Sequence, residues 1–302
     1  MPNTFVDPSK VARMGIAMVT KDLKLAQTFN RDFESEFGGG HGHTVNVRVP
    51  AVLQARSKTL RNRVAITTDT LTESTVPVAL TDVVYSAVPV TDEELTLDIV
   101  DFGRQVLAPQ ALAIVEDLEE RAVTTMQSVA ETLTVPYDAA TPGKTFTAVR
   151  KMLRDMGAPE SGLTAAVGTQ IYADLIESGE LKDASQSGST DALRNAVAGR
   201  VRGFDTIESN RLDDDELCFY IRGVSFSMAI RAPQRPAGVA FGASHAENGF
   251  AMRWIRDYDS VYLEDRSILS TFVGTKVMTM KRSGDGATVT PTIRVKASTV
   301  PA

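Results

Sequence analysis

The strongest pattern in this sequence is a helical stripe within residues 91–130. Small and apolar side chains recur there at steps of three and four residues, which aligns them on one face of a helix with about 3.6 residues per turn. Thr91 and Glu94 have the spacing of a capping box, and Pro109 is tolerated in a first helical turn. The stripe comprises Leu107, Ala111, Ile114, Leu118, Ala122, Thr125 and Val129, and most charged residues between positions 116 and 121 fall on the other face. We therefore predict a continuous helix over residues 109–130, about 30 Å long, that packs on a sheet.

Composition excludes several classes of protein. With 43% hydrophobic and 23% charged residues, the 302-residue chain has the balance of a folded protein rather than a disordered one. A net charge of −6 argues against a dedicated nucleic-acid binder. No apolar run approaches the ~20 residues that a membrane span requires, so no membrane partner is predicted. The single cysteine, Cys218, lies in an apolar strand pattern and is interpreted as a buried hydrophobe in a protein made in a reducing cytoplasm.

The first 43 residues are predicted to form an N-terminal arm. Apolar positions between residues 9 and 37 have helical spacing, which indicates one or two amphipathic helices. Gly38, Gly39 and Gly40 then mark a hinge, because three consecutive glycines cost too much backbone entropy inside a helix. We expect the arm to contribute to assembly more than to the fold of the subunit. His41 and His43 have no suitable third ligand nearby, so no metal site is predicted.

Residues 44–90 change to the two-residue period of β-strands and are predicted to form a long antiparallel hairpin. Pro50, Pro77 and Pro89 would disrupt a central strand, so this hairpin should be peripheral. Its tip is strongly basic, a property that equally fits a solvated face or a contact surface. The basic residues are Arg48, Arg56, Lys58, Arg61 and Arg63.

A compact α/β region is predicted after the long helix. It contains a helix over residues 146–156, a strand over 163–167, a helix starting near Thr169 and a further short helix before residue 199. A strand at residues 217–221 follows. Residues 231–245 are interpreted as a loop, residues 249–280 as two closing strands, and the segment after Lys281 as an extended tail with little packing.

No catalytic constellation is present in the sequence. It lacks a phosphate-binding loop, a zinc-protease motif and a paired-cysteine motif, and residues 223–227 lack the second glycine of a nucleophile elbow. The acidic clusters fall on helix starts, helix faces and turns. We therefore predict no catalytic residue, cofactor or metal ligand, and a function that depends on shape and contacts.

The order of these segments resembles the major capsid proteins of tailed bacteriophages with the Hong Kong 97 fold, nearest the branch of the Salmonella podovirus coat protein. The resemblance is carried by TVNVRVP, VTDEELTLD, APQALAIVEDLEERAV, AGRVRGFDTIESNRL and the closing segment GFAMRWIRDYDSVYLEDRSILSTFVGTKV. No stretch is long enough for the large inserted domain of the podovirus protein. The resemblance implies an α+β fold with an arm (1–43), an extended loop (44–90), a peripheral domain with a spine helix (91–140 and 244–280), an axial domain (141–243) and a tail (281–302).

The resemblance also implies a function. The chain would assemble into pentamers and hexamers of an icosahedral shell around packaged double-stranded DNA, with scaffolding, portal and possible decoration proteins as partners. It would be assembled in the host bacterial cytoplasm and end in the virion. Two alternatives stay open: an encapsulin-like cellular compartment, and a cytoplasmic α/β enzyme whose site escapes motif inspection.

Charge suggests how neighbouring subunits would recognise each other. Residues 48–63 carry five bases and no acid, whereas residues 92–120 carry nine acids and one base, Arg104. In the family the extended loop lies across the peripheral domain of the adjacent subunit. The basic loop is therefore expected to face acidic residues that include Asp92, Glu93 and Glu94.

Overall fold

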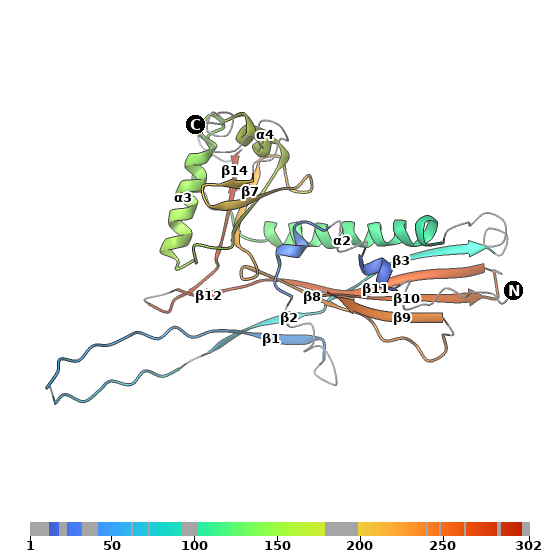
Figure 1. Cartoon of the computed structure of the whole chain (residues 1–302), viewed down its shortest axis with the longest axis horizontal. Coiled ribbons are helices and arrows are strands. Elements are labelled where there is room, and N and C mark those ends of the chain that lie inside the picture. The colour runs from blue at the N-terminus through green and yellow to red at the C-terminus, as the bar shows by residue number, and fades with distance from the viewer. Residues whose placement is uncertain are drawn as a thin grey trace. The chain divides into compact units, whose positions relative to one another are not determined.

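The computed structural model describes residues 12–17, 23–31, 42–61, 63–71, 73–91, 102–178, 199–239, 241–247, 249–262, 264–282 and 285–297. They form a mixed α+β fold that divides into two compact units (Figure 1). Unit 1 is built from described residues within 1–45, 78–125 and 226–276, and unit 2 from those within 46–77, 126–225 and 277–302. No helix among the described residues is long and apolar enough to span a membrane.

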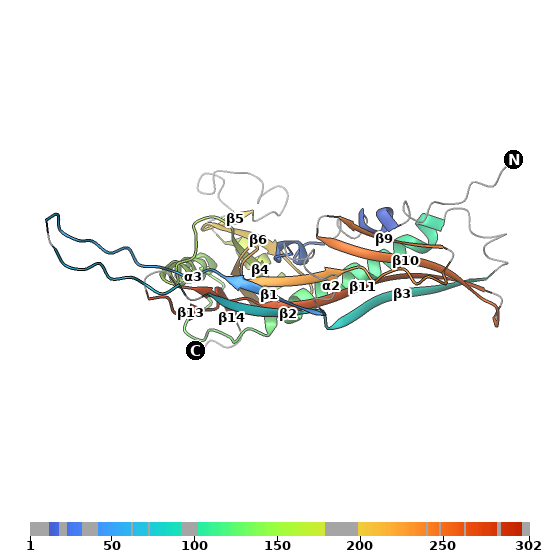
Figure 2. The ribbon, with the colours of Figure 1, turned by 90° about the horizontal axis from the view of Figure 1, so that it is seen from below.

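Unit 1 is organised around a five-stranded sheet (Figure 2). Its strand order is β3 (Asp82–Thr91), β11 (Glu264–Val277), β10 (Phe250–Asp259) and β9 (Phe241–Glu247), and β8 (Phe226–Arg231) also pairs with β11. The pairs that β10 makes with β9 and β11, and the β3–β11 pair, are antiparallel. The prediction that residues 231–245 form a loop is wrong in its last third, because β9 pairs with β10 from Phe241 onward.

The predicted long helix is α2 (Ala108–Gln127), which lies along this sheet (Figure 1). A π-helical turn, η4 (Gly103–Leu107), precedes it, and Pro109 occupies the first turn as predicted. The helix ends at Gln127, so Val129 lies beyond it and is half-buried. The predicted stripe is otherwise buried at Leu107, Ala111, Ile114, Leu118, Ala122 and Thr125. The proposed capping residue Thr91 instead ends strand β3, and Glu94 lies outside the described residues.

A buried polar cluster sets the position of α2 on the sheet. Gln110 Nε2 donates to the carbonyl oxygens of Ser86 (3.0 Å) and Ser267 (2.7 Å). Ser267 Oγ donates to Gln110 Oε1 (2.8 Å) and accepts from Trp254 Nε1 (3.0 Å). Each of these groups would cost free energy if buried without a partner. The helix is therefore held in one register against β3, β10 and β11.

The N-terminal segment packs against the same helix. Residues 12–17 are helical, and a short 3-10 helix, η1 (Ala26–Thr28), follows. The Glu119 carboxylate accepts hydrogen bonds from the backbone N–H groups of Lys24 (2.6 Å), Leu25 (3.1 Å) and Ala26 (3.2 Å). Glu119 is buried, so it is an exception to the expectation that most charged residues between 116 and 121 lie opposite the apolar stripe. Its charge is compensated by three backbone dipoles at the start of η1.

Residues 29–31 continue this attachment. Phe29 stacks on Phe226 with ring centroids 5.0 Å apart, and the Arg31 guanidinium lies 4.2 Å from the centroid of the Phe250 ring. The Asn30 N–H donates to the Phe226 carbonyl (2.8 Å), and the Met228 N–H donates to the Asn30 carbonyl (3.0 Å). The described part of the arm therefore belongs to the core of unit 1. This differs from the expectation that the arm contributes to assembly more than to the fold of the subunit. The hinge glycines Gly38, Gly39 and Gly40 lie outside the described residues.

The predicted hairpin exists but is shorter than expected. Strands β1 (Thr44–Val49) and β2 (Ser74–Ala79) form a two-stranded sheet, and the described residues between them contain no strand. After Ala79 the chain changes partner, and β3 joins the sheet of unit 1 as an edge strand. The hairpin therefore ends near residue 79 rather than at 90. Pro77 and Pro89 lie in a two-stranded ribbon and an edge strand, as the missing N–H of proline requires.

Unit 2 contains a second five-stranded sheet. Its order is β14 (Thr292–Lys296), β7 (Glu216–Ile221), β4 (Leu163–Val167), β6 (Phe204–Glu208) and β5 (Arg200–Val201). Only the β4–β6 pair is parallel, and the other three pairs are antiparallel. The predicted strands at 163–167 and 217–221 are thus confirmed as central strands, and Cys218 is fully buried within the second.

Two helices and an aromatic cluster complete unit 2. The helices are α3 (Pro142–Asp155) and α4 (Thr169–Glu177), close to the predicted positions. Phe146 meets Phe204 and Phe219 edge-to-face, with centroids 5.9 and 4.9 Å apart, and Phe204 and Phe219 are 5.0 Å apart. All three rings are fully buried. The further helix predicted before residue 199 lies outside the described residues.

The C-terminal segment corrects another prediction. Strands β12 (Met280–Lys281) and β13 (Thr288–Val289) form a small ribbon, and β14 then pairs with β7. Ile293 and Val295 are buried, so these residues are part of the core rather than a loosely packed tail. Arg294, on the opposite face, forms an ion pair with the fully buried Glu216, which also accepts a hydrogen bond from Gln127 Nε2 (2.9 Å).

Candidate assembly surfaces

The extended loop, here residues 44–79, carries apolar side chains that the chain itself does not bury. Its two arms run side by side in both views (Figures 1 and 2). Leu60 and Ile66 are 93% and 78% exposed. Such surface on a folded chain generally marks a contact with another molecule. Leu53, Val64 and Leu71 are also exposed.

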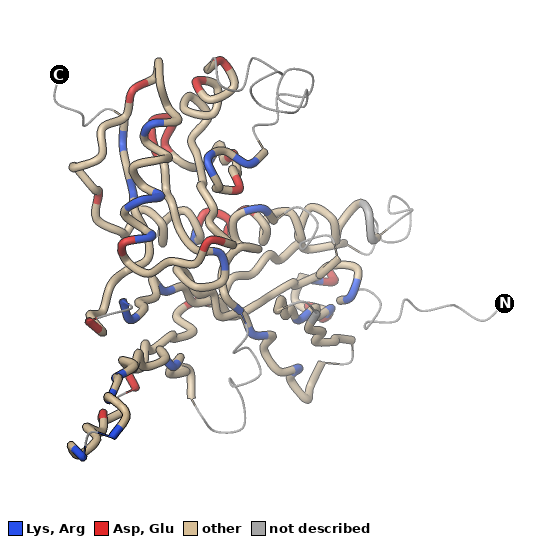
Figure 3. The backbone as a smooth tube through the Cα atoms, turned by 60° about the vertical axis from the view of Figure 1, so that its left-hand side comes forward, with Lys and Arg blue, Asp and Glu red and all other residues tan. Residues whose placement is uncertain are grey.

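The same loop carries the predicted basic residues, and blue cationic positions follow it to its end in Figure 3. Arg56 forms an ion pair with Asp69 of the opposite arm, and Lys58 Nζ donates to the Val64 carbonyl. Arg61 has a φ of 69°, which places it in the left-handed turn at the tip. All five predicted basic residues, Arg48, Arg56, Lys58, Arg61 and Arg63, are exposed. Arg61 and Arg63 form no ion pair with another described residue, so their charge is available to a partner.

The acidic side of the predicted pairing is only partly described. Asp92, Glu93 and Glu94 lie outside the described residues, so their pairing with the loop stays a prediction. On α2, Asp117 is paired with Arg121 at 2.6 Å, and Arg121 also reaches Asp82 of β3 at 2.6 Å. The Thr81 hydroxyl and the Arg121 guanidinium together lower the pKa of Asp82. These acids are therefore already engaged within unit 1.

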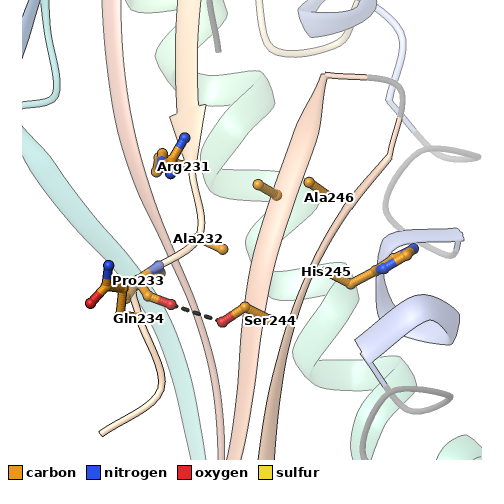
Figure 4. A pocket seen from close by; sticks show the side chains of 8 residues that line it. Arg231, Ala232, Pro233, Gln234, Ser244, His245 and Ala246 are labelled. Atoms are coloured by element: carbon orange, nitrogen blue, oxygen red, sulfur yellow. Dashed lines mark hydrogen bonds between the residues drawn. The ribbon is translucent and has the colours of Figure 1, made fainter. Parts of the chain in front are cut away.

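A hollow of about 260 Å³ lies in unit 1 beside β8 and β9 (Figure 4). Arg231, Gln234, Ser244 and His245 contribute its polar lining, and Ser244 Oγ donates to the Pro233 carbonyl (2.9 Å). The hollow is open, and its hydroxyl is occupied by that backbone bond rather than directed at an imidazole. This arrangement is not one that activates a nucleophile.

Two further observations concern chemistry. Among the described residues, no group of three or more His, Cys, Asp or Glu side chains could hold a metal ion. Burial, with Glu216 nearby, raises the pKa of the Cys218 thiol. A thiol in that setting is an inert packing group, because the thiolate is the reactive form.

Comparison with solved structures identifies the fold. The chain is similar to a structure from Mycobacterium phage Che8, with a TM-score of 0.65, 17% identity and coverage of 92% of each chain. It is also similar to the mature capsid of bacteriophage PhiM1, with a TM-score of 0.57, 11% identity and coverage of 87% of this chain and 84% of that chain. A virus-like particle from Pyrococcus furiosus matches with a TM-score of 0.54, 12% identity and coverage of 95% and 98%. No family model and no curated protein sequence matches.

These similarities extend over most of each chain, so they concern the whole architecture and not a shared substructure. The predicted fold class, the α+β fold of Hong Kong 97-type phage capsid proteins, is confirmed. Sequence identity is too low for any residue role to be transferred from these structures. The roles of individual residues must therefore be argued from this chain alone.

Proposed function

We propose that this protein is a major capsid protein that self-assembles into an icosahedral shell enclosing packaged viral double-stranded DNA. One observation supports this most strongly: a chain with a phage capsid fold carries a long loop on which Leu60 and Ile66 are 93% and 78% exposed, and on which Arg61 and Arg63 form no ion pair with another described residue. Burying that loop on neighbouring copies stabilises an assembly in which every subunit both gives and receives the contact. A net charge of −6 suits a container, because a basic wall would bind the packaged phosphates.

The partners and location follow from this role. The principal partner is a second copy of the chain, in pentamers and hexamers, and scaffolding, portal and decoration proteins are further expected partners. Packaged DNA would lie nearby without specific recognition. The mature location would be the virion, after assembly in the host bacterial cytoplasm. Nearest kinship with the Salmonella podovirus coat protein stays a prediction, which the segment order quoted above supports.

An encapsulin-like compartment is the second candidate. The similarity to a virus-like particle from Pyrococcus furiosus favours it, but the phage structures include the one with the higher TM-score, 0.65 against 0.54. The sequence shows no recognisable cargo-docking pocket. An enzyme is the least supported candidate, because solved structures that share this fold include a phage capsid and a virus-like particle.

Size-exclusion chromatography with negative-stain electron microscopy tests the proposal. The purified full-length chain is expected to form rings or closed particles of hundreds of kilodaltons. A compact monomer or dimer at all concentrations would contradict a shell function and favour the enzyme. Particles from infected cells that contain double-stranded DNA would separate the viral role from a cellular compartment, which would contain protein cargo.

Charge pairing between loop and neighbour is a separate proposal. Exposed pairs contribute only about 0–1 kcal/mol each, but a shell repeats them at every contact. Arg61→Glu with Arg63→Glu is expected to impair assembly, and compensating Glu93→Lys with Glu94→Lys to restore part of it. High salt should weaken the wild-type contact, since charges separated by more than ~8 Å are screened at physiological ionic strength. Normal assembly of the double reversal would refute the pairing.

A further inference from the structure

The hollow beside β8 and β9 is cationic. Arg231 lies in its lining, and no acidic residue does. Two more arginines lie at its margin: Arg235 Nη1 donates to the Gly242 carbonyl (3.4 Å), and Arg253 Nη1 donates to the Gln234 carbonyl (2.8 Å). We call this space, with its three guanidinium groups, the arginine hollow. Its other lining residues are Ala232, Pro233, Gln234, Ser244, His245, Ala246 and Ala251.

Strand register explains how these groups come together. Arg253 of β10 is directly opposite Ser244 of β9, so their side chains share a face of the sheet. Arg231 is the last residue of β8, which β11 holds in the same sheet. His245 takes the opposite face of β9 and points away from Gln234 and Ser244 (Figure 4). The cations of the arginine hollow are therefore arginines, and two of them stand on strands.

The positive charge of Arg235 and Arg253 is not compensated within the described part of the chain. Their hydrogen bonds go to two backbone carbonyls and, from Arg253 Nε, to Ser270 Oγ (3.3 Å). Burial lowers the pKa of the Arg253 guanidinium, and no carboxylate among the described residues opposes that effect. A guanidinium has five N–H donors and stays charged at neutral pH. Both side chains therefore keep donors for an anionic group that enters the hollow.

The size and the apolar part of the hollow narrow the class of ligand. A volume of about 260 Å³ is below the roughly 300–1,000 Å³ of pockets for drug-sized molecules, so the space suits a single side chain. A guanidinium binds a carboxylate through two parallel N–H···O bonds, and arginine clusters recognise acidic peptide motifs. Ala232, Pro233, Ala246 and Ala251 offer apolar surface to the stem of such a side chain. Inorganic phosphate has no apolar part that could cover them.

We propose that the arginine hollow binds a carboxylate side chain from an acidic, partly apolar peptide segment of a partner protein. The extended loop of another copy is not this segment, because its five bases against two acids would be repelled by three arginines. The inference goes beyond the proposed shell function, since it concerns a different partner and a site on the single subunit. Binding can be measured whether or not the chain assembles.

Isothermal titration calorimetry of the full-length chain tests the proposal. The probe is the peptide acetyl-Leu-Glu-Leu-amide, and acetyl-Leu-Gln-Leu-amide is its neutral counterpart. The glutamate peptide is expected to bind more tightly. Arg231→Gln with Arg253→Gln should weaken its binding about tenfold or more, because charge-assisted hydrogen bonds are lost. Arg13→Gln with Lys276→Gln is the control, since it removes the same charge from two exposed sites of unit 1.

A second variant tests the hollow without changing its charge. Ala246 is exposed in the lining, so Ala246→Leu should fill the space and block the peptide. Ala87→Leu enlarges an exposed alanine of β3 in the same sheet and should leave binding unchanged. The melting temperature of each variant shows whether the chain is folded. If the arginine variant does not fold, Ala246→Leu alone decides the question.

Three results would overturn the inference. The first is equal affinity of the wild-type chain for the two peptides, or no binding of either at millimolar concentration. The second is a loss of affinity in the control variants as large as in the hollow variants, which would indicate diffuse attraction rather than a site. The third is inorganic phosphate binding at least as tightly as the glutamate peptide and depending on the same arginines. That result would replace the peptide carboxylate with a free anion.

Discussion

Removal of the Glu119 carboxylate is expected to detach the N-terminal segment from the spine helix. In Glu119→Ala, the N–H groups of Lys24, Leu25 and Ala26 lose their acceptor. Two of these bonds are buried and the third is partly buried. A buried donor left unsatisfied costs ~1–3 kcal/mol, so two such donors and a partly hydrated one give a loss of roughly 3–5 kcal/mol. Alanine is a good helix former, so α2 itself should persist.

Thermal unfolding and amide exchange of the unassembled subunit provide the assay. A loss of that size lowers the melting temperature by on the order of 10 °C in a unit of this size. The amides of residues 24–26 should lose protection before those of β10 and β11, because local opening of the segment becomes cheaper. Glu120→Ala is the matched control: it removes a carboxylate from the same helix turn, but Glu120 is exposed and should change stability by less than about 0.5 kcal/mol.

Either of two results would refute this reasoning. Equal melting temperatures for Glu119→Ala and Glu120→Ala would mean that the carboxylate does not hold the segment. Unchanged protection of residues 24–26 in a destabilised Glu119→Ala would mean that the loss arises elsewhere. Only the combination of a specific melting shift and selective exchange supports the role derived from the three hydrogen bonds.

Three other predictions address the packing and charge pairs of unit 1. Leu118→Asp buries an unpaired charge and should cost roughly 3–5 kcal/mol in chemical denaturation, whereas Leu112→Asp, half-exposed on the same helix, should cost little. Gly274→Ala places a Cβ 1.7 Å from the Ala79 carbonyl oxygen and should cost about 1–3 kcal/mol as overpacking does, whereas Gly238→Ala meets no atom within 4 Å and should be neutral. The pKa of Asp82 is lowered from 3.8 by the Thr81 hydroxyl and Arg121, so its stabilising effect is present above that pH and lost as the pH falls through the lowered value. The difference in melting temperature between wild type and Asp82→Asn should therefore shrink as the pH is lowered. A difference that stays constant with pH would contradict this assignment.

Local periodicity was sufficient to predict the elements whose burial follows one face. The stripe from Leu107 to Thr125 is a property of consecutive turns, so it identifies α2 without reference to the rest of the fold. Strand partners are different. Residues 74–91 keep a two-residue period throughout, yet the chain leaves the hairpin at Ala79 and pairs with β11 from Asp82 onward. Alternation reports which face is buried and does not report which strand lies alongside.

Charged residues with buried partners were the second source of error. Most charged residues between 116 and 121 are predicted to lie opposite the stripe, but Glu119 is buried and lies four residues from both Val115 and Val123, which are also buried. Strand β14 was missed because Arg294 lies at its centre, although the residues on either side of Arg294, Ile293 and Val295, are buried as in a core strand. In each case the position of the residue in the helical or strand period predicted its burial better than its charge did. The compensating groups are the backbone N–H donors of residues 24–26 and the Glu216 carboxylate. They come from distant parts of the chain, so the sequence around Glu119 or Arg294 does not reveal them.

The contact surfaces could be predicted in kind but not in pairing. Basic and apolar residues at 48–71 indicated a loop that needs a partner, since nothing in a short two-stranded ribbon can bury Leu60 or Ile66. The exposure of Tyr258 and Tyr262, where β10 and β11 are joined, could not be predicted, because it depends on how the two strands are placed side by side. A subunit that folds on its own must leave its assembly surfaces in water, so they resemble ordinary loops in the sequence. Which of these surfaces meet in an assembly depends on the arrangement of two copies, and no local pattern within one chain reports that arrangement.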